Sequence, residues 1–299
     1  MNVYMYLHRG LSGNKGKIAF RKWYSCLREI RSLVPAGLPI IALTATASKR
    51  TKQDIFQVLE LVSPFEVLEN PLVTNIAYST QLIEKGKSLF DYFRWLILEV
   101  KERGINTERI LVYCQSIKQC TQLFQLFTVE LMEAMYSDTL LSPMKRIVEM
   151  LHSKTPKTVK DNIIDSFSKK DGCVRVLFAT IAFGMGIDAK GVTSVIHVGP
   201  SKNLESYVQE SGRCGRDGKQ SRAILLYNNR MCMFCEKDIK EYVVSQKCKR
   251  TFLQQHFDFD ENMHSSPLIL HNCCDTCATK CNCNDNECAS SLFLPLINT

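Results

Sequence analysis

Two arginines three residues apart lie in a glycine-rich segment, QESGRCGRDG, at residues 209–218. Because of this spacing, Arg213 and Arg216 fall on one face of a helix or turn. A guanidinium makes paired hydrogen bonds to phosphate oxygens, and it can stabilise the charge that develops on a transferred phosphoryl group. The segment therefore indicates phosphate chemistry, although two arginines in isolation would favour a solvated basic turn.

A second glycine-rich segment, ATIAFGMGIDA at residues 179–189, directly follows a predicted strand. Gly184 and Gly186 would let the backbone turn tightly and approach a ligand closely. Thr180 and Asp188 add a hydroxyl and a carboxylate at the carboxyl end of that strand. The glycine pair alone favours an ordinary turn. The segment therefore indicates a ligand site only in combination with the arginine pair downstream.

Nine of the fourteen cysteines are crowded into the tail, between Cys232 and Cys288. The N-terminus does not have the pattern of a secretory signal, so this crowding favours metal binding over disulfides. Cys274 and Cys277 have the spacing of a chelating pair. The alternative is a set of reduced thiols.

Apolar periodicity predicts that strands and helices alternate along the chain. The expected strands are 38–45, 110–114, 174–179, 193–199 and 223–227. The expected helices are one from Thr51 to Pro64 and others at 89–104, 119–135, 155–167 and 204–211. This alternation implies an α/β fold, a mostly parallel sheet with helices on both faces and ligands at the carboxyl ends of its strands. We therefore expect the arginine pair to face that carboxyl edge.

The composition is that of a globular protein, with 45% hydrophobic and 23% charged residues among 299, which excludes global disorder. No apolar run approaches the roughly 18 residues that a membrane span needs, so no membrane partner is expected. The net charge of +8 leans weakly toward a polyanion such as nucleic acid. Strand signals stop after Tyr227 and Cys and His become frequent, so we place a domain boundary near residue 229.

The two glycine-rich segments, in this order and separated by a strand, resemble motifs V and VI of superfamily-two helicases. Their amino-acid sequences are most similar to those of the RecQ family of 3′–5′ DNA helicases. Four upstream segments add to the resemblance: ALTATAS at 42–48 (motif III), ILVYCQS at 110–116 (motif IV), HSKTP at 152–156, and FRKWYSCLREIRSLVP at 20–35, which is similar to part of the aromatic-rich loop. The resemblance implies a RecA-like helicase C-terminal lobe, a remnant of the first lobe and a small helical zinc-binding subdomain.

The resemblance also assigns the residues that face the nucleotide. Arg216 matches the arginine finger that reaches the γ-phosphate, and Arg213 matches its companion at the cleft. Gln209 matches the leading glutamine of motif VI, and these three residues form the expected catalytic set. Asp188 and Gly186 of motif V are expected to bind the nucleotide together with the two arginines.

DNA contacts follow from the resemblance in three segments. The residues concerned are Thr180 and Gly184 in motif V, Thr44 and Thr46 in motif III, and Phe20 and Trp23 in the aromatic-rich loop. The two aromatic rings are candidates for stacking on bases, a contact worth about 1–3 kcal/mol per base. Ordinary core packing is an equal alternative for them. The expected partner is single-stranded or fork-like DNA.

The family's zinc subdomain uses four cysteines, one on a helix and the others in a compact cluster. By this resemblance Cys248 is the first ligand, and Cys274 and Cys277 are two more. The fourth Zn²⁺ ligand is either Cys273, which we favour, or His271, which avoids the backbone strain of two adjacent ligands. Three further cysteines exceed what one site needs, namely Cys281, Cys283 and Cys288. We favour free thiols over a second metal for them, because only three remain.

ATP hydrolysis requires a phosphate-cradling loop, G-x-x-x-x-G-K-[ST], and an acidic motif for Mg²⁺. The 299 residues contain neither pattern. The most similar segment, GNKGK at 13–17, is followed by Ile18, where the loop requires Ser or Thr. We therefore expect a chain truncated before motif III, with ATP and Mg²⁺ bound only in a full-length parent. The expected domains are the first-lobe remnant at 1–70, the second lobe at 71–229, the zinc subdomain at 230–290 and a tail at 291–299.

Two functions follow from these patterns. The first is a RecQ-like 3′–5′ DNA helicase, present here as a partial chain that is inactive alone. The second is a non-catalytic nucleic-acid-binding or regulatory fragment, with a full-length helicase paralogue as a candidate partner. The family implies a nuclear location. For the chain itself we expect salt-dependent DNA binding without DNA-stimulated ATP turnover.

Overall fold

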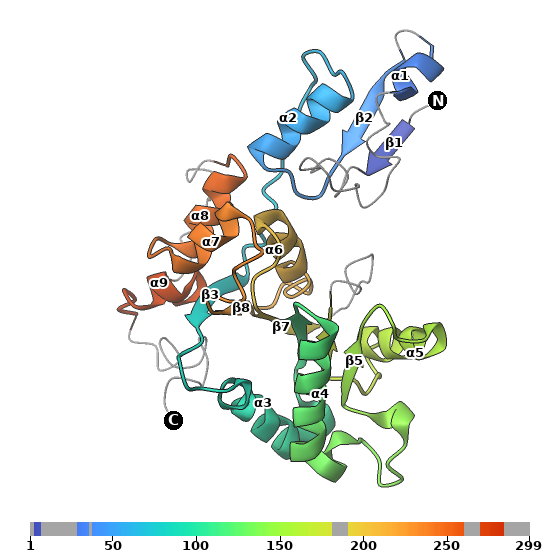
Figure 1. The fold of residues 1–299 in the computed structure, drawn as a ribbon, viewed down its shortest axis with the longest axis vertical. Coiled ribbons are helices and arrows are strands. Elements are labelled where there is room, and N and C mark those ends of the chain that lie inside the picture. The colour runs from blue at the N-terminus through green and yellow to red at the C-terminus, as the bar shows by residue number, and fades with distance from the viewer. Residues whose placement is uncertain (1–2, 7–28, 36–37, 181–190, 260–269, 284–299) are drawn as a thin grey trace. The chain divides into compact units, whose positions relative to one another are not determined.

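The computed structural model describes residues 3–6, 29–35, 38–180, 191–259 and 270–283 (Figure 1). The chain divides into two compact units. The first comprises residues 1–71 with 253–263, and the second comprises residues 72–252 with 264–299.

The first unit contains a short parallel sheet and a helix that follows it. β1 (Val3–Tyr6) pairs with β2 (Ile40–Leu43), and the helices are α1 (Ile30–Leu33) and α2 (Lys49–Val58). Ser48 is the N-cap of α2, because its hydroxyl accepts the Thr51 N–H at 3.3 Å. The helix therefore begins before the predicted Thr51 start and ends before the predicted stop at Pro64.

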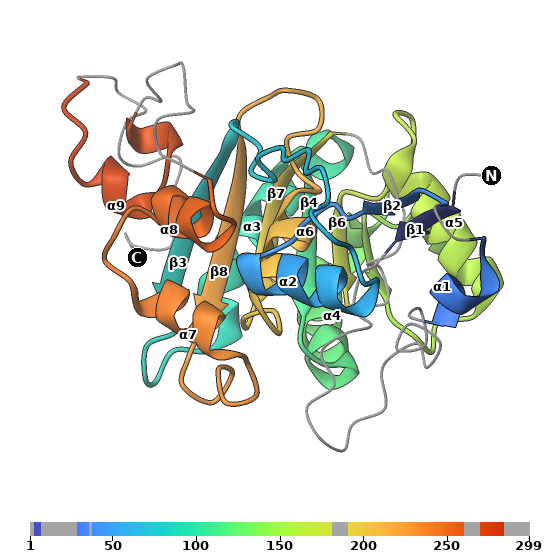
Figure 2. The ribbon, with the colours of Figure 1, turned by 90° about the horizontal axis from the view of Figure 1, so that it is seen from above.

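The second unit is built on a six-stranded sheet in the order β3-β8-β7-β4-β6-β5, and every neighbouring pair is parallel. The strands are β3 (Ile76–Leu82), β4 (Arg109–Cys114), β5 (Val148–Leu151), β6 (Val176–Ala179), β7 (Val192–Val198) and β8 (Ser221–Tyr227). In Figure 2 the strands lie side by side with β3 at one edge. A parallel sheet of this kind must be covered on both faces, because its strands are apolar on both sides.

Helices cover the two faces of this sheet (Figure 1). α3 (Leu89–Arg103) and α4 (Ile117–Leu131) pack on one face, where Phe93, Phe127 and Phe178 make edge-to-face contacts with ring centroids 6.1, 6.2 and 4.9 Å apart. α6 (Leu204–Ser211) and α7 (Lys237–Val244) lie on the other face. This unit also contains α5 (Lys157–Ser168) and α9 (Asp275–Ala278), and the residues of α8 (Lys249–His256) are divided between the two units.

The five strands expected from the sequence are confirmed, with small shifts at their ends. Two strands of the second unit were not predicted. β3 contains Ser79, Thr80 and Gln81 and lacks the apolar run of the central strands, and β5 has only four residues. No helix within the described ranges is long and apolar enough to cross a membrane.

Candidate functional site

The loop that carries the arginine pair runs from α6 to β8, and its last part, from Gly215 to Lys219, lies at the amino ends of the strands. The Gly215 N–H donates to the carbonyl of Val192 at the start of β7, at 3.2 Å. Asn75, which directly precedes β3, donates its side-chain amide to the carbonyls of Gly215 and Lys219, at 2.9 and 2.5 Å. These contacts place Gly215 and Lys219 at the amino edge, whereas Arg213 lies beside Tyr113 near the carboxyl end of β4. The expectation that the arginine pair faces the carboxyl edge stays a prediction.

Glycine is required at position 215 for two reasons. Its φ of +73° lies in the left-handed region, which L side chains rarely adopt. A Cβ at this position would also lie 2.8 Å from Nδ2 of Asn75, the group that holds the loop. The loop is therefore shaped by backbone geometry and by one amide side chain from the neighbouring strand.

The two arginines have different surroundings. The Arg213 side chain is 7% exposed and lies near the phenol of Tyr113 on β4. Burial raises the pKa of Tyr113 well above its ordinary range, and the positive charge of Arg213 opposes that shift. Arg216 is exposed, and its Nε donates to the Gly212 carbonyl at 3.2 Å. Gln209, half-buried, lies on the last turn of α6. Arg216 is therefore the arginine of the pair that a ligand can reach.

A buried polar network ties α6 to the sheet. Oε2 of Glu210 accepts the Ser201 hydroxyl at 2.6 Å and lies 3.1 Å from Nε2 of His197 on β7. The His197 ring in turn stacks on Tyr113, with ring centroids 5.2 Å apart. Since Glu210 is three residues before Arg213, this network fixes the end of the helix from which the arginine loop departs.

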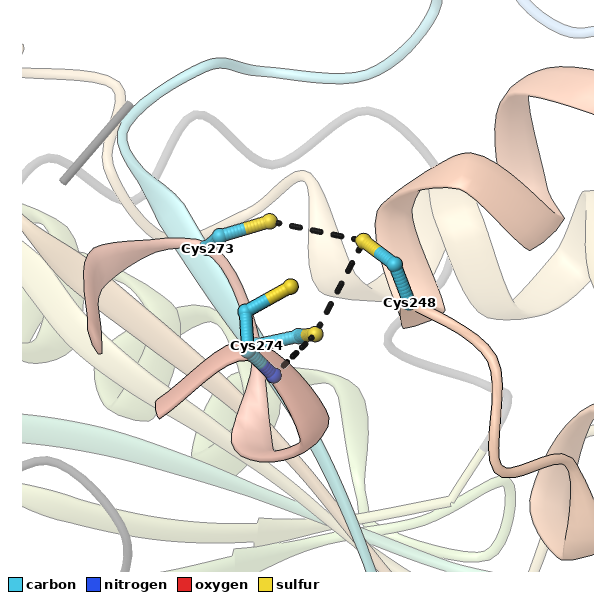
Figure 3. A group of neighbouring side chains, drawn as sticks. Cys248, Cys273 and Cys274 are labelled. Carbon is cyan, nitrogen blue, oxygen red and sulfur yellow. Dashed lines mark hydrogen bonds between the residues drawn. The ribbon is translucent and has the colours of Figure 1, made fainter. Parts of the chain in front are cut away.

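Four cysteines converge in the C-terminal part of the chain. The sulfur atoms of Cys273 and Cys274 point toward Cys248 (Figure 3), whose Sγ lies 3.6 and 3.8 Å from them. The Cys277 sulfur completes a group of four ligand atoms that all lie within 4.8 Å of one another. Four thiolates bound to zinc at about 2.3 Å in a tetrahedron would be about 3.8 Å apart. The donor set and its spacing therefore fit a zinc ion.

The close contacts between these sulfur atoms also shift the pKa values of their thiols in opposite directions. The thiols of Cys273 and Cys274 lower the pKa of Cys248, because they hydrogen-bond to its sulfur. The same contact with Cys248 raises the pKa of Cys273, and burial raises the pKa of Cys277 to about 12. The group thus stabilises one thiolate, at Cys248, and a bound metal ion would displace the protons of the other thiols.

Backbone and arginine contacts fasten this cysteine group to the edge strand β3. The Tyr78 N–H donates to the Cys273 carbonyl at 3.2 Å, so the segment that carries two of the thiols continues the sheet beyond β3. Arg250, two residues after Cys248, is 2% exposed and lies over the Tyr78 ring at 5.4 Å. Its guanidinium donates to the carbonyls of Val73, Thr74 and Ile76.

Comparison with known proteins connects these features to one family. The model of the helicase conserved C-terminal domain matches residues 91–218, which include the arginine loop. The ATP-dependent DNA helicase Q-like 2 of Arabidopsis thaliana is 30% identical over 276 residues, 87% of this chain and 35% of that protein. The RecQ-like DNA helicase BLM of Xenopus laevis is 31% identical over 209 residues, 70% of this chain and 14% of that protein.

This chain is related to the RecQ helicases. It spans about a third of the length of the Arabidopsis relative. Among solved structures, S. cerevisiae Dbp5 bound to RNA and ADP BeF3 has a TM-score of 0.55 at 16% identity, over 87% of this chain and 58% of that one. Mycobacterium smegmatis Lhr bound to ssDNA and AMP-PNP has a TM-score of 0.50 at 17% identity, over 79% and 34%. These structures confirm the fold, a RecA-like helicase C-terminal lobe.

The other residues expected at the sites of this RecQ relative are only partly described. In the first unit, Thr46 is buried and Thr44 is exposed, and the Thr44 hydroxyl donates to the Thr46 carbonyl at 2.9 Å. In the second unit, Thr180 is half-buried directly after β6. Five expected residues lie outside the described residues: Phe20, Trp23, Gly184, Gly186 and Asp188.

A cavity of about 780 Å³ opens at the carboxyl ends of β4, β7 and β8 of the RecQ-like lobe. Three exposed basic residues line it: Lys118, Lys202 and Arg230. α4 begins here, with Ser116 as its N-cap. A helix N-terminus and several cations at one place favour a phosphate group.

Sequence reasoning missed the residues that position the arginine loop. Glu210 directly follows Gln209 in the motif VI segment, so the motif itself offered a signal for it. His197 and Asn75 offered none, because each is distant in sequence and acts through a contact that only the folded sheet creates. His271, the alternative fourth zinc ligand, is grouped with Cys281 and Cys283, and Cys273 is grouped with the other three cysteines.

Proposed function

We propose that this chain is the second lobe and zinc module of a RecQ-like 3′–5′ DNA helicase. The observation that carries the proposal is the α6–β8 loop of a helicase C-terminal domain, which a left-handed glycine and a buried glutamate network hold in one shape. On this proposal Arg216 is the arginine finger toward a γ-phosphate, and Arg213 and Gln209 support it. Asp188 and Gly186 belong to the same nucleotide side.

ATP turnover is proposed for the longer protein and not for these 299 residues alone. A phosphoryl-transfer site needs a loop that holds the β- and γ-phosphates and a carboxylate for Mg²⁺, and no segment of this sequence has either pattern. An exposed Arg216 stabilises charge only when a nucleotide lies opposite it. The chain itself is therefore proposed to bind DNA without hydrolysing ATP.

The proposed DNA-binding surface includes the cavity at the carboxyl ends of β4, β7 and β8. Lys118, Lys202 and Arg230 supply positive charge there, and the overall charge of +8 has the sign that DNA binding needs. The contacts proposed from the family resemblance are Thr44, Thr46, Thr180, Gly184, Phe20 and Trp23. The nucleic acid is proposed to be single-stranded or fork-like DNA, since two of the relatives, helicase Q-like 2 of Arabidopsis thaliana and RecQ of Pasteurella multocida, are DNA helicases by name.

The four-cysteine group is proposed to hold Zn²⁺ and to act structurally. Cys248, Cys273, Cys274 and Cys277 offer a full tetrahedral set, which is typical of structural zinc sites. We also propose the domain bounds expected from the sequence, in which the zinc subdomain comprises residues 230–290. A nuclear location belongs to it as well.

A second candidate function is a non-catalytic module that binds nucleic acid or regulates a full-length helicase paralogue. The specific observation that favours it is the absence of both ATP-site motifs from the sequence given. Both candidates use the same DNA-binding surface. They differ because, in the second candidate, this segment does not belong to a larger protein that contains the ATPase motifs.

DNA binding tests the proposed surface directly. Fluorescence anisotropy with a labelled oligo-dT would compare the chain with Lys118→Ala and Arg230→Ala, and each change is expected to weaken binding several-fold at low salt. Lys101→Ala is the matched control, because Lys101 is exposed at the end of α3, near the opposite edge of the sheet. Equal affinities for all three variants and the unaltered chain would remove this surface from the proposal.

A further inference from the structure

Three potential metal ligands form a second group in the cysteine-rich part of the chain. Nδ1 of His271 lies 3.5 Å from the Cys281 sulfur and 3.3 Å from the Cys283 sulfur. All three ligand atoms are within 4.8 Å of one another. We propose that this group is a second zinc site, separate from the four-cysteine site.

The distances fit metal coordination. Zinc binds imidazole nitrogen at about 2.0–2.1 Å and thiolate sulfur at about 2.3 Å, so a tetrahedral ion separates a nitrogen from a sulfur by about 3.6 Å. The two N···S distances at His271 are within a few tenths of an ångström of that value. The ligands are therefore already placed for a shared ion.

Hydrogen bonding alone does not explain why two sulfurs approach one ring nitrogen. Nδ1 of an imidazole carries either one proton or one lone pair, so it serves one partner at a time. A metal ion bound to Nδ1 attracts both thiolates at once. His271 is also 5% exposed, and a buried imidazole needs a partner for its polar atoms.

The local structure shows what the ion would hold together. His271 lies in a short 3-10 helix, Leu270–Asn272, directly before the first site's Cys273 and Cys274. Cys281 and Cys283 belong to a segment without helix or strand. An ion between them would fix that segment, which follows α9, against the short helix.

The two groups together account for the ambiguity of the fourth ligand in the sequence. Cys273 completes the four-cysteine group, which leaves His271 for the second ion. Imidazole and thiolate are the ligand types that suit zinc. Three protein ligands leave one position, to be filled by water or by a further side chain. The sequence alone favours free thiols at Cys281 and Cys283, and the contact with His271 is the observation that changes this.

Zinc stoichiometry tests the proposal. The purified chain, dialysed against metal-free buffer with a reductant, is expected to contain two zinc ions by inductively coupled plasma mass spectrometry. The double variant Cys281→Ser/Cys283→Ser and the variant His271→Ala are each expected to contain one. Cys232→Ser, a half-buried cysteine outside both groups, should keep two. One zinc ion in the unaltered chain, or two in the double variant, would overturn the proposal.

Cobalt substitution gives a second readout that needs no comparison of stability. The thiolate-to-cobalt absorption of the unaltered chain reports six thiolates if both sites are filled, and it should fall by about one third in the double variant, which loses two of the six. If circular dichroism shows that a variant does not fold, the number of metal ions bound by the unaltered chain tests the proposal on its own. Two ions support the second site, and one ion refutes it while leaving the proposed DNA-binding function intact.

Discussion

Oε2 of Glu210 lies 3.1 Å from Nε2 of His197, and both side chains are buried between α6 and the sheet. The Ser201 hydroxyl donates to the same carboxylate oxygen. This contact joins β7 to the last turn of α6 three residues before Arg213. The position of the arginine loop therefore depends on a buried carboxylate.

Removal of that carboxylate should destabilise the protein. Glu210→Ala leaves His197 and Ser201 buried without their partner, and an unsatisfied buried polar group costs about 1–3 kcal/mol. Urea unfolding followed by circular dichroism measures this loss. Glu241→Ala is the control, since its pairing with Lys237 is on the surface and such pairs contribute about 0.5 kcal/mol or less. Equal losses in the two variants would contradict the role assigned to Glu210.

The shape of the arginine loop can be tested with a pair of glycines. Gly215→Ala should cost more stability than Gly218→Ala. Both glycines have positive φ, +73° and +80°, so each change carries a backbone cost of about 1 kcal/mol. Only a Cβ at position 215 meets Asn75, at 2.8 Å, whereas nothing lies within 4 Å at position 218. The unfolding midpoints of the two variants measure this difference. A larger loss of stability in Gly218→Ala than in Gly215→Ala would contradict the prediction.

The four-cysteine group should stabilise the fold through its metal. Cys277→Ser is expected to lower the unfolding midpoint and to weaken the effect of a chelator on stability, because metal affinity contributes to folding free energy. The unaltered chain and Cys232→Ser should both lose stability when the chelator is added. Thermal unfolding of the three proteins with and without the chelator gives the six values. A chelator effect as large in Cys277→Ser as in the unaltered chain would show that this group is not where the stabilising metal binds.

Stability should fall between about pH 4.5 and pH 7 because of one buried acid. Burial raises the pKa of Glu149 from 4.5 to about 7, although Arg146, 3.7 Å away, opposes the shift. The folded chain therefore keeps a proton that the unfolded chain releases in this range, and the folded state loses about 1–3 kcal/mol as pH rises. Glu149→Gln should remove that slope, and the exposed Glu133→Gln should retain it. Parallel pH profiles for both variants would refute the assignment.

Local patterns in the sequence predicted most of the fold. The strand at residues 110–114 and the helix at 204–211 were predicted because long apolar periodicities do not depend on distant partners. β3 was missed because its pairing is with β8 and because it also contacts α9, where the Thr80 N–H donates to the Asp275 carboxylate. Information of this kind is absent from a local window.

The candidate site was predicted less completely for the same reason. Motif similarity identified Arg213 and Arg216, but it did not reveal that Gly215 bonds to the start of β7 or that Arg213 lies beside Tyr113. The choice between Cys273 and His271 was open in the sequence, because both have plausible spacing. The folded chain separates them into two groups. Sequence therefore identified the chemistry of the residues, and tertiary contacts determined which of them act together.

Salt-dependent binding of single-stranded DNA, measured beside ATP turnover on the same preparation, tests the central claim most directly. The account predicts an association constant that falls linearly on a log–log plot against salt, with a slope that decreases by about 0.7 for each phosphate contact removed, as in Arg230→Ala. It predicts no DNA-stimulated ATP turnover by the chain alone. DNA binding that is absent at low salt, or turnover that Arg216→Ala abolishes, would contradict it.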